Sequence, residues 1–517
     1  MLKEKRIIVF LLLIFIFGGI AGYSNIINSF FISDDFSLLM RVFALGPFGA
    51  FFKRWFCFYR PMVSLSLFID YAVWGLNPTG FHITSITIHS LNSFLVFLVC
   101  LCLLDDSKID RNYSLFVALS SGLLFLFLHS HSEAVTWITD RADLLALFFS
   151  LNCFLAYMFY RKKSYFLYLP ASLLFYACAL FSKESAVTIP LIILCYESYL
   201  LKSKRNKTES STKSLSPFLL YLIIFSFYLL ARYLVLGELI GGYGNSVHLN
   251  FKPALIFENL FSYTARVFLP PTPNIKPIFM VIMILLILLI VGIKSLRKNL
   301  PWSLWFLVSA FYLSLLPVIN LGINYAKDTQ GERFIYLPSA FLSLFAIILF
   351  CYILIDHKVL FAIICGSIII FSALQLFRIN KNWVIAGKIS QNIVNSIRDE
   401  DKADRLFIIT LPDNINGAYI FRNGAWEAID IFVGRGRFKQ IKLMSLCEIS
   451  DEDNKIEIKS NADGYEVQLL NPKGCFKDLG TRYVDDIKCN SFRLRLGDLT
   501  NNDKIIFYSA GKTSTLF

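Results

Sequence analysis

The sequence is poor in charge. Only 17% of its 517 residues are Asp, Glu, Lys or Arg, whereas soluble domains average about 25%. It contains no Gly-rich phosphate-binding loop and no zinc-like Cys spacing, which argues against ATP-binding and nucleic-acid-binding proteins. No internal repeat is visible in the sequence either. These absences point away from a soluble protein and away from a repeat architecture.

Apolar residues are abundant instead. They make up 56% of the chain, which includes 51 Phe and 24 Tyr, as expected for helices in a bilayer with aromatic residues at its interfaces. A net charge of +13 is also found in proteins that bind nucleic acids. Here, however, lysines and arginines cluster in short loops between apolar runs, which is a topology signal. We therefore expect the lipid bilayer, and no nucleic acid, as a partner.

Eleven apolar runs approach the length of about 20 residues that crosses a bilayer. They lie near residues 7–27, 84–104, 113–130, 142–160, 165–181, 186–201, 216–236, 275–293, 301–320, 336–355 and 359–377. The first run has a basic start and no clear cleavage site, so we interpret it as an uncleaved anchor. The stretch 253–271 carries Glu258 and Arg266 and is interpreted as an interfacial or re-entrant helix. The predicted fold class is a mainly α, polytopic membrane protein with about 11 transmembrane helices.

The loops between these runs set the orientation. If Met1 is cytoplasmic, the loops richest in Lys and Arg, such as "LKSKRNKTESSTKS" and "KSLRKN", are cytoplasmic too, as the positive-inside rule requires. The opposite loops then carry the acids, bases and histidines suited to chemistry. We predict an integral protein of the inner membrane of a bacterium, with these loops on the outer side.

The composition changes towards the C-terminus. Residues 384–517 are more polar, with short alternating runs such as "RLFIITLP" and "KIEIKS" and one helix-like stretch, "GAWEAIDIFVG". This predicts a β-rich (α+β) extracytoplasmic domain after a transmembrane domain at 1–383. Cys447, Cys475 and Cys489 lie in the β-rich domain, and a Cys475–Cys489 disulfide is one of the pairings open to them.

Two adjacent carboxylates, Asp34 and Asp35, follow the first apolar run. Solvated acids at a helix end are common and need no function. Adjacent acids nevertheless raise each other's pKa, and a partly desolvated carboxylate is a competent general base. We interpret the pair as catalytic because further polar motifs share its side of the membrane.

The next outer string runs from "FYRP" to "IHSLNS". Pro61 fixes a turn that would aim the Arg60 guanidinium along the membrane surface. His82 and His89 are seven residues apart and therefore share a helix face. His89 is interpreted as a hydrogen-bonded core histidine, whereas His82, at the interface, fits either a core or a substrate-binding role.

The string "HSHSEAVTWITDRAD" is the densest polar cluster. His129, His131 and Glu133 alternate, so they could present metal ligands on an extended segment. A divalent cation, Mg²⁺ or Mn²⁺, is therefore a candidate cofactor. We predict that it is not strictly required, because protein cations can neutralise a phosphate leaving group.

Acids and bases alternate in the remaining outer strings. Arg141 lies between Asp140 and Asp143, where a structural ion pair is the alternative to a role in a site. Two further strings bring more pairs to this side: "SKES", with Lys183 and Glu184, and "AKDTQGER", with Lys327, Asp328, Glu332 and Arg333. Several cations on one face suit a phosphate presented from the bilayer, and equally suit lipid headgroups.

Taken in order, three strings resemble a known family: "YRPMVSLSLFIDYAVWGLNPTGFHITSITIHSLNSFLVF", "HSHSEAVTWITDRADLLA" and "SKESAVTIP"; "GERFIYLPS" and "RINKNWVIAG" resemble bacterial members. They are similar to the membrane half of the transmembrane O-mannosyltransferases that carry tetratricopeptide repeats, and to bacterial relatives of these enzymes. Those proteins are polytopic glycosyltransferases of the GT-C class. The resemblance, over roughly residues 25–385, implies that a polyprenyl-phosphate-linked sugar on the outer leaflet is the donor.

The resemblance also implies roles for side chains. Asp34 would deprotonate the acceptor hydroxyl and Asp35 would position donor or acceptor, with transfer in one inverting displacement. The candidates for holding the departing lipid phosphate are Arg60, Arg141, Lys183 and Arg333. The wider set of candidate substrate-binding residues adds His82, His131, Glu133, Asp143 and Glu184.

The C-terminus departs from that family, because a β-rich domain stands where tetratricopeptide repeats would follow. This layout also resembles bacterial and phage-borne glucosyltransferases that modify lipopolysaccharide O-antigen. We therefore predict transfer of a glucose- or mannose-type sugar to a cell-surface glycan such as O-antigen. The alternatives are a protein O-mannosyltransferase, or a flippase or polymerase of lipid-linked sugars; a flippase is disfavoured because the charges gather at one face.

Reporter fusions test the predicted topology. Fusions after residues 206 and 297 should report the cytoplasm, and fusions after residues 245 and 400 the outer side, because the Lys/Arg bias sets the orientation. A C-terminus found in the cytoplasm would contradict the count of eleven spans.

Overall fold

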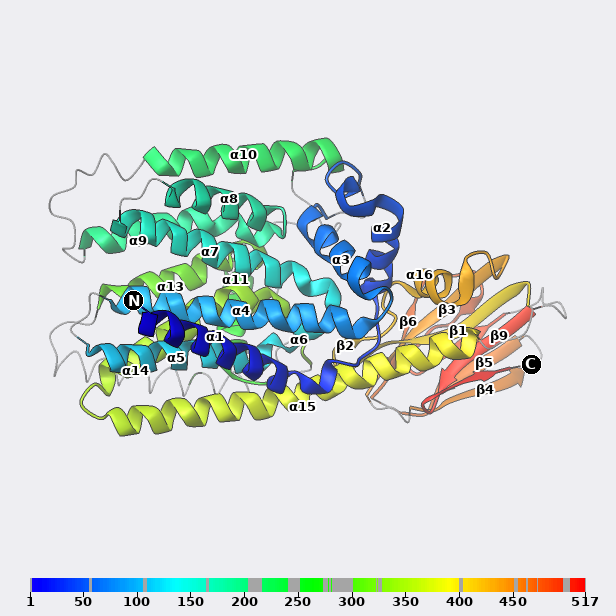
Figure 1. The fold of residues 1–517 in the computed structure, drawn as a ribbon. Coiled ribbons are helices and arrows are strands. Elements are labelled where there is room, and N and C mark those ends of the chain that lie inside the picture. The colour runs from blue at the N-terminus through cyan, green and yellow to red at the C-terminus, as the bar shows by residue number, and fades with distance from the viewer. Residues whose placement is uncertain are drawn as a thin grey trace.

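The computed structural model describes a helical part followed by a β-rich part (Figure 1). The described residues are 2–54, 58–105, 109–163, 167–202, 216–239, 252–272, 278, 280, 301–321, 323, 328–398, 403–450, 454–461, 464–471, 473–495 and 503–516.

The helical part is a bundle whose long helices lie side by side (Figure 1). Its α-helices are α1 (Leu2–Gly22), α2 (Asp34–Gly49), α3 (Pro61–Trp74), α4 (Pro78–Leu104), α5 (Arg111–Phe127), α6 (Ser132–Thr136), α7 (Arg141–Lys163), α8 (Tyr168–Leu180), α9 (Ile189–Lys202), α10 (Ser216–Leu236), α11 (Pro253–Phe268), α13 (Trp302–Ser314), α14 (Tyr336–Ile353) and α15 (Lys358–Arg398). Among the short 3-10 helices are η1 (Ser24–Ile26), η2 (His129–His131), η3 (Ile138–Asp140), η4 (Glu184–Thr188), η7 (Leu316–Val318) and η8 (Glu332–Ile335).

Local sequence explains several helix starts. The Asn77 side chain caps α4 by accepting a 3.1 Å hydrogen bond from the Thr79 amide, and Pro78 occupies the first turn. The Asp110 carboxylate caps α5 in the same way. Pro61 begins α3 directly after Arg60. Such caps satisfy the amide groups that the first turn of a helix leaves without partners.

Among the described residues, six helices are long and apolar enough to cross a membrane. A seventh is added if the bent pair Arg111–Phe127 and His129–Thr136 forms one span. Four shorter apolar helices accompany them: Arg6–Gly22, Pro61–Trp74, Tyr168–Leu180 and Trp302–Val318. The prediction of a mainly α membrane protein with a small C-terminal β region is confirmed. The number of eleven spans stays a prediction, and most of its span 275–293 lies outside the described residues.

α11 covers most of the stretch interpreted as interfacial or re-entrant. Its 16 residues are about 24 Å long at 1.5 Å per residue, less than the bilayer core of about 30 Å. Arg266, in its last turn, is buried and forms an ion pair with Glu332 of η8. This length and this buried pair fit that interpretation.

The β-rich part contains two sheets, in the strand orders β10-β9-β1-β3-β6, with β2 beside β1, and β4-β5-β8-β7. The strands are β1 (Arg405–Ile415), β2 (Ala418–Tyr419), β3 (Gln440–Ile449), β4 (Ile456–Asn461), β5 (Gly464–Leu469), β6 (Cys475–Asp478), β7 (Val484–Asp485), β8 (Ser491–Leu494), β9 (Asp503–Ser509) and β10 (Lys512–Thr515). The predicted helix is present as α16 (Ala425–Ile429), continued by the π-helix η9 (Asp430–Gly434). β1 pairs in parallel with β3 and β9 and is almost wholly buried, as a central parallel strand should be.

α15 joins the two parts. Its 41 residues extend about 60 Å, twice the thickness of the bilayer core, so the helix continues beyond it. Trp383, Ile389 and Ile393 near its C-terminal end belong to the same buried apolar cluster as β1. The sequence-based domain boundary between residues 383 and 384 therefore falls inside a continuous helix (Figure 1).

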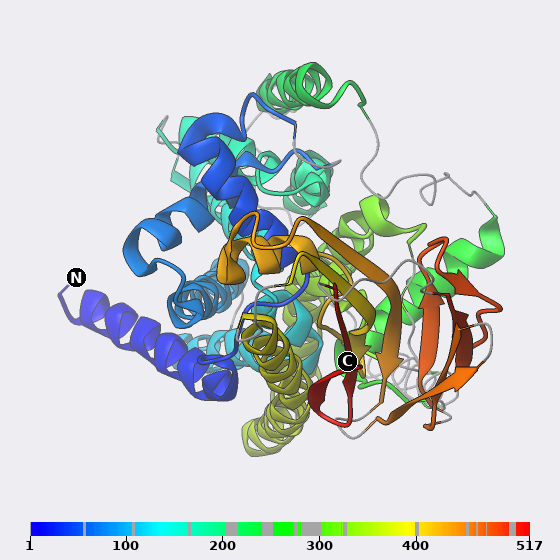
Figure 2. The same cartoon turned by 90° about the vertical axis from the view of Figure 1, so that its right-hand side faces the viewer.

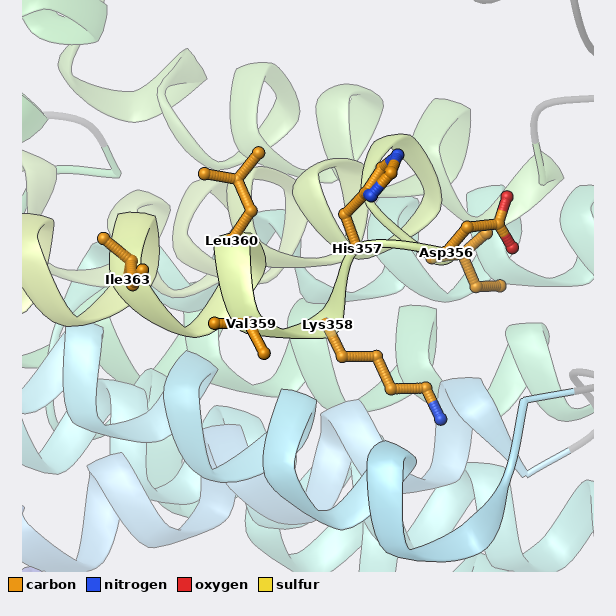
Figure 3. Close-up of a pocket in the computed structure, with 7 residues that line it drawn as sticks. Asp356, His357, Lys358, Val359, Leu360 and Ile363 are labelled. Carbon is orange, nitrogen blue, oxygen red and sulfur yellow. The ribbon is translucent and has the colours of Figure 1, made fainter.

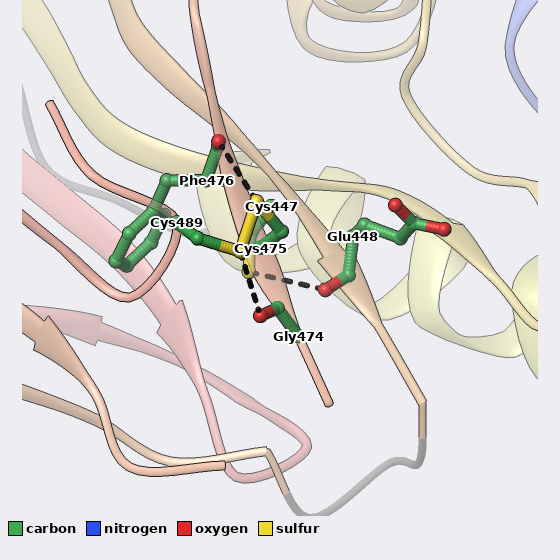
Figure 4. The surroundings of a disulfide bond; sticks show 6 residues. All are labelled: Cys447, Glu448, Gly474, Cys475, Phe476 and Cys489. Carbon is green, nitrogen blue, oxygen red and sulfur yellow. Dashed lines mark hydrogen bonds between the residues drawn. A yellow bond between two sulfur atoms is a disulfide. The ribbon is translucent and has the colours of Figure 1, made fainter. Parts of the chain in front are cut away.

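Cys475 and Cys489 form a disulfide in the β-rich part, the pairing that the sequence left open (Figure 4). Cys447 on β3 is a buried free thiol. Disulfides persist in oxidising compartments. The pairing is therefore consistent with a location of the β-rich part outside the cytoplasm.

Candidate active site

The acidic pair begins α2 at the end of the helical part that faces the β-rich part (Figure 1). Asp35 is buried, and its carboxylate accepts hydrogen bonds from the Ile32 amide (3.1 Å), the Thr139 amide (2.9 Å) and the Thr139 hydroxyl (2.8 Å). Burial outweighs these hydrogen bonds and raises the pKa of Asp35 to about 7. Asp35 therefore joins the start of α2 to η3 and has little access to a substrate.

Asp34 keeps some exposed surface. Partial burial raises its pKa, a hydrogen bond from the Asn423 side chain and the charges of Arg333 and Arg422 lower it, and Glu427 raises it. A raised pKa makes a carboxylate a better proton acceptor near neutral pH. Asp34 is therefore the more accessible of the two carboxyl groups, and the roles of base for Asp34 and positioning residue for Asp35 stay predictions.

Charged residues from the different sequence strings form ion pairs with one another. Each of the four predicted phosphate-binding cations is bound to an acid from a different string: Arg60 to Glu184, Lys183 to Asp143, Arg333 to Glu133 and Arg141 to Asp70. The Arg60–Glu184 pair is bidentate, with N–O distances of 2.5 and 3.1 Å. Buried charges need such partners because desolvation is costly. The pairs therefore tie helices that are distant in sequence.

Arg141 is fully buried in its pair with Asp70 of α3. It also donates a 2.7 Å hydrogen bond to the Phe81 carbonyl, and Thr84 donates one of 2.7 Å to Asp70. The structural ion pair considered for Arg141 is thus formed, with Asp70 in place of Asp140 or Asp143. The sequence signal for Asp70 was a lone acid within an apolar run.

Arg333 is the predicted cation that lies beside the acidic pair. Its backbone amide donates to Glu133 (3.0 Å), and its guanidinium pairs with Glu133 and lies 3.8 Å from Asp140. The guanidinium also covers the Trp137 ring, at 5.3 Å from its centroid. Its charge acts directly on Asp34. Arg333 can therefore offset negative charge that develops near the base.

Arg41, which was not predicted, is a buried cation on the same helix as the acidic pair. Only 3% of its surface is exposed, its Nε has no hydrogen-bond partner, and no acid pairs with it among the described residues. Burial, and to a smaller extent the charge of Arg60, lowers the pKa of Arg41 to about 10. A buried guanidinium next to a second one favours an anion. Seven residues from Asp34, Arg41 lies on the same helix face, about 10.5 Å along the axis.

The "HSHSE" string is helical, which corrects the extended segment imagined for it. His129 and His131 form η2 and Glu133 lies in α6, so their side chains do not alternate as in a strand. His131 lies 2.7 Å from the Ser339 hydroxyl, whereas Glu133 pairs with Arg333. The described residues contain no group of three or more potential metal ligands. Whether a divalent cation takes part stays a prediction.

His82 and His89 lie inside the bundle. His89 makes hydrogen bonds of 2.8 Å to the Tyr336 hydroxyl and 3.0 Å to the Leu126 carbonyl, as its core interpretation requires. His82 is buried and lies 3.1 Å from the Ser29 carbonyl. It therefore supports the chain just before the acidic pair.

A polar cavity of about 540 Å³ lies between the helical and β-rich parts. Arg333 and Phe334 line it from η8, and Tyr419, Arg422 and Lys477 line it from the β-rich part. A second pocket, of about 750 Å³, lies at the turn between α14 and α15, with Asp356, His357 and Lys358 in its wall (Figure 3). That turn is at the opposite end of the bundle from α2 (Figure 1). The 540 Å³ cavity, in contrast, is lined by Arg333 and Arg422, whose charges act on Asp34.

The sequence missed the contribution of the β-rich part. Arg422 pairs with Asp413 (2.7 and 3.1 Å) and donates to Gln330 (3.0 Å). Tyr419 contacts both Glu133 and Arg333. No local pattern connects these residues with loop residues that precede them by 86 positions or more, so only the tertiary structure reveals them.

No family model matches the chain. It is 32% identical over 170 residues to human protein O-mannosyl-transferase TMTC1, covering 31% of this chain and 18% of that protein. It is 29% identical over 279 residues to human protein O-mannosyl-transferase TMTC2 (52% of this chain, 32% of the relative) and 28% over 291 residues to tmtc2 of Xenopus laevis (53% and 33%). The chain thus resembles polytopic glycosyltransferases of the GT-C class, as its motif strings indicate, and spans a third or less of the length of these relatives.

Among solved structures, the chain is similar to the archaeal oligosaccharyltransferase AglB from Archaeoglobus fulgidus, described in complex with an inhibitory peptide and a dolichol-phosphate. The match covers 95% of this chain and 76% of that chain, at 11% identity and a TM-score of 0.42. A likeness at this level assigns nothing further.

Substitution of each acid by its amide should separate their roles. Asp34→Asn should lower sugar transfer by about 10²–10⁴-fold with an unchanged melting temperature, because an amide cannot accept the proton. Asp35→Asn should lower the melting temperature, since its NH₂ group would face the Ile32 amide and leave a buried donor unpaired, at about 1–3 kcal/mol. Transfer assays and thermal unfolding in detergent measure both effects. Wild-type activity in Asp34→Asn would contradict the assignment of the base.

Proposed function

We propose that this protein is an inverting glycosyltransferase that moves one sugar from a polyprenyl-phosphate donor to an acceptor hydroxyl. The proposal rests on Asp34, a partly desolvated carboxylate beside Arg333. Both residues lie in a chain that is similar to protein O-mannosyltransferases. A base and a cation at one point are what the transfer requires.

In the proposed reaction, Asp34 takes the proton of the acceptor hydroxyl. The oxygen of that hydroxyl attacks the anomeric carbon of the donor sugar at the same time. The bond between that carbon and the phosphate oxygen breaks, and the lipid phosphate leaves with the electron pair. Arg41 and Arg60 would hold this phosphate, because Arg41 is buried without an acidic partner among the described residues. The separation of about 10.5 Å between the levels of Asp34 and Arg41 on α2 leaves room for a sugar between base and phosphate. Lys183 and Arg333 remain further candidates.

The acceptor favoured by the comparisons is a protein hydroxyl, and the favoured sugar is mannose. The relatives reported above are protein O-mannosyltransferases, whereas no feature of the fold favours lipopolysaccharide O-antigen. The alternative of the sequence analysis is therefore better supported than its first choice. A flippase would need its charges near the middle of the membrane, whereas the pairs of Arg60, Lys183 and Arg333 join strings predicted to share the outer side.

We further propose that the transmembrane part lies in a bacterial inner membrane, with the acidic pair and the β-rich part outside. The Lys/Arg bias of the loops and the Cys475–Cys489 disulfide support this orientation.

A reconstituted assay tests the function. The full chain in lipid nanodiscs is given mannosyl- or glucosyl-phosphoryl polyprenol, with either a threonine-containing peptide or an O-antigen glycan as the acceptor. We expect mannosyl transfer to the peptide with inversion, detected by mass spectrometry and NMR, and retained in a chelator. No transfer to either acceptor, or retention of configuration, would contradict the proposal; transfer to the glycan alone would restore the first choice of acceptor.

The phosphate site is tested by Arg41→Gln. The neutral amide cannot balance the phosphate charge, so the KM for the donor should rise about tenfold or more, as for a lost charge-assisted hydrogen bond. The KM for the peptide should change little. Arg493→Gln, at an arginine whose side chain is 68% exposed in the β-rich part, is the control. Equal donor KM values for the two variants would remove Arg41 from the site.

A further inference from the structure

The residue before the acidic pair has an unusual backbone. Ser33 is buried and adopts φ 47° and ψ −123°, a left-handed conformation that residues with a side chain rarely adopt. Such conformations persist only where the surroundings impose them, and they gather at functional sites. Ser33 therefore requires an external support that holds the turn into α2.

The support comes from the β-rich part. The Ser33 amide donates a 2.7 Å hydrogen bond to the Ile420 carbonyl. Gly424, with φ +78°, lies against the Ser33 carbonyl so closely that a Cβ atom on it would be 2.2 Å from that oxygen. The amide and the carbonyl of Ser33 are thus both in contact with one short segment, residues 419–427, which runs from the end of β2 into α16.

The same segment also holds the first turn of α2. The rings of Phe36 and Phe421 stack with centroids 5.9 Å apart and an angle of 8° between their planes. The Ser37 hydroxyl donates a 2.9 Å hydrogen bond to Glu427. Asn423 hydrogen-bonds to Asp34 itself. Figure 2 shows α16 directly in front of α2, so the segment covers the N-terminal end of that helix.

α15 supports the preceding residues. The Ser390 hydroxyl donates a 2.8 Å hydrogen bond to the Phe31 carbonyl, and a Cβ atom on Gly387 would lie 2.9 Å from the Phe30 amide. The chain that leads into the acidic pair is therefore fixed by α15, and its last turn by segment 419–427.

We propose that segment 419–427 of the β-rich part is the positioning element of the base: it imposes the Ser33 turn and so holds Asp34 beside Arg333. This inference rests on the proposed function for its catalytic meaning. It makes the β-rich part a component of the active site, required for transfer even though most of it is distant from the acidic pair.

Among the described residues, three charged groups act on Asp34: Arg333 on η8, and Arg422 and Glu427 on segment 419–427. Asp34 in turn raises the pKa of its neighbour Asp35 on α2. Displacing the segment admits water to Asp34, which should return its pKa towards that of an ordinary carboxyl. Removing the Asn423 hydrogen bond alone, with the segment in place, should instead raise that pKa, because the hydrogen bond favours the charged form.

Two variants and a matched control test the inference in the full chain. Gly424→Ala introduces the clash with Ser33, and Asn423→Ala removes one hydrogen bond without a clash. Gly436→Ala is the control, because Gly436 has nearly the same φ of +74° and no atom within 4 Å of its added Cβ. It therefore carries the same backbone strain in the same part of the protein without touching α2.

The first readout needs no substrate. A hydrophobic carbodiimide modifies protonated carboxyl groups, so the pH dependence of Asp34 labelling, followed by mass spectrometry, reports its pKa. We expect the labelling midpoint to shift to lower pH in Gly424→Ala, to higher pH in Asn423→Ala, and to stay at the wild-type value in Gly436→Ala. The acidic limb of the transfer rate should shift in the same directions.

The second readout is the transfer reaction. Gly424→Ala should lower kcat by about 10²-fold, the cost of misplacing a catalytic group by about 1 Å, with little change in the KM for the donor. Equal midpoints in Gly424→Ala and Gly436→Ala, or shifts of the same sign in Gly424→Ala and Asn423→Ala, would overturn the inference. If Gly424→Ala does not fold, Asn423→Ala tests the inference alone: the labelling midpoint of Asp34 should move to higher pH, and an unchanged midpoint would overturn the inference.

The two proposals fail separately. A wild-type chain that transfers no sugar but shows the expected labelling shifts would refute the glycosyltransferase function and leave the support of Asp34 by segment 419–427 in place. An active wild type with identical labelling in all variants would refute the inference and keep the function.

Discussion

The need to neutralise buried charge organises the helical part. An unpaired ion costs several kcal/mol when it leaves water, and breaking a buried pair costs about 3–5 kcal/mol. The acids and bases of the outer strings accordingly pair across the bundle. Arg141 with Asp70 joins α7 to α3, and Lys183 with Asp143 joins the start of η4 to α7. These pairs set the relative positions of the helices at the end where Asp34 lies.

The same constraint identifies what is left for a substrate. Once most of the charges have protein partners, a group without one is informative. Arg41 is buried and has no acidic partner among the described residues, which is why the proposed reaction assigns the donor phosphate to it. Asp34 differs from Asp35 in a similar way: Asp35 is saturated by three backbone and hydroxyl donors, whereas Asp34 keeps exposed surface. A charged group whose hydrogen bonds are all made within the protein stabilises the fold, whereas one that lacks protein partners can bind a ligand.

The β-rich part gives this site its last component. It supplies Tyr419 and Arg422 to the polar cavity and contacts Ser33 through Ile420 and Gly424. α15 supports this arrangement because it runs as one continuous helix from the bundle to Arg398, and residues near its C-terminal end pack in the same apolar cluster as β1. A site built between two rigid parts can hold both the base and the wall of the cavity in fixed positions.

Local chemistry determined a large share of this picture. Apolar runs, loop charges and alternating strands are properties of neighbouring residues, so the sequence alone predicted a polytopic helical part, a small β-rich part and an acidic pair at one end. A local pattern fails where the backbone differs from the one assumed. The "HSHSE" alternation suggested a row of ligands, but η2 and α6 are helical and send His131 and Glu133 to different partners.

What the tertiary structure decided is which charges meet. The sequence listed Arg141 among phosphate ligands and ignored Arg41, because pairing depends on distances between helices and not on spacing along the chain. Arg141 is fully buried in its pair with Asp70, whereas no acid pairs with Arg41 among the described residues. The contact of Gly424 with Ser33 joins residues almost 400 positions apart. Sequence determined which charged groups are present; only packing, through the cost of burying charge, determined which of them pair with one another.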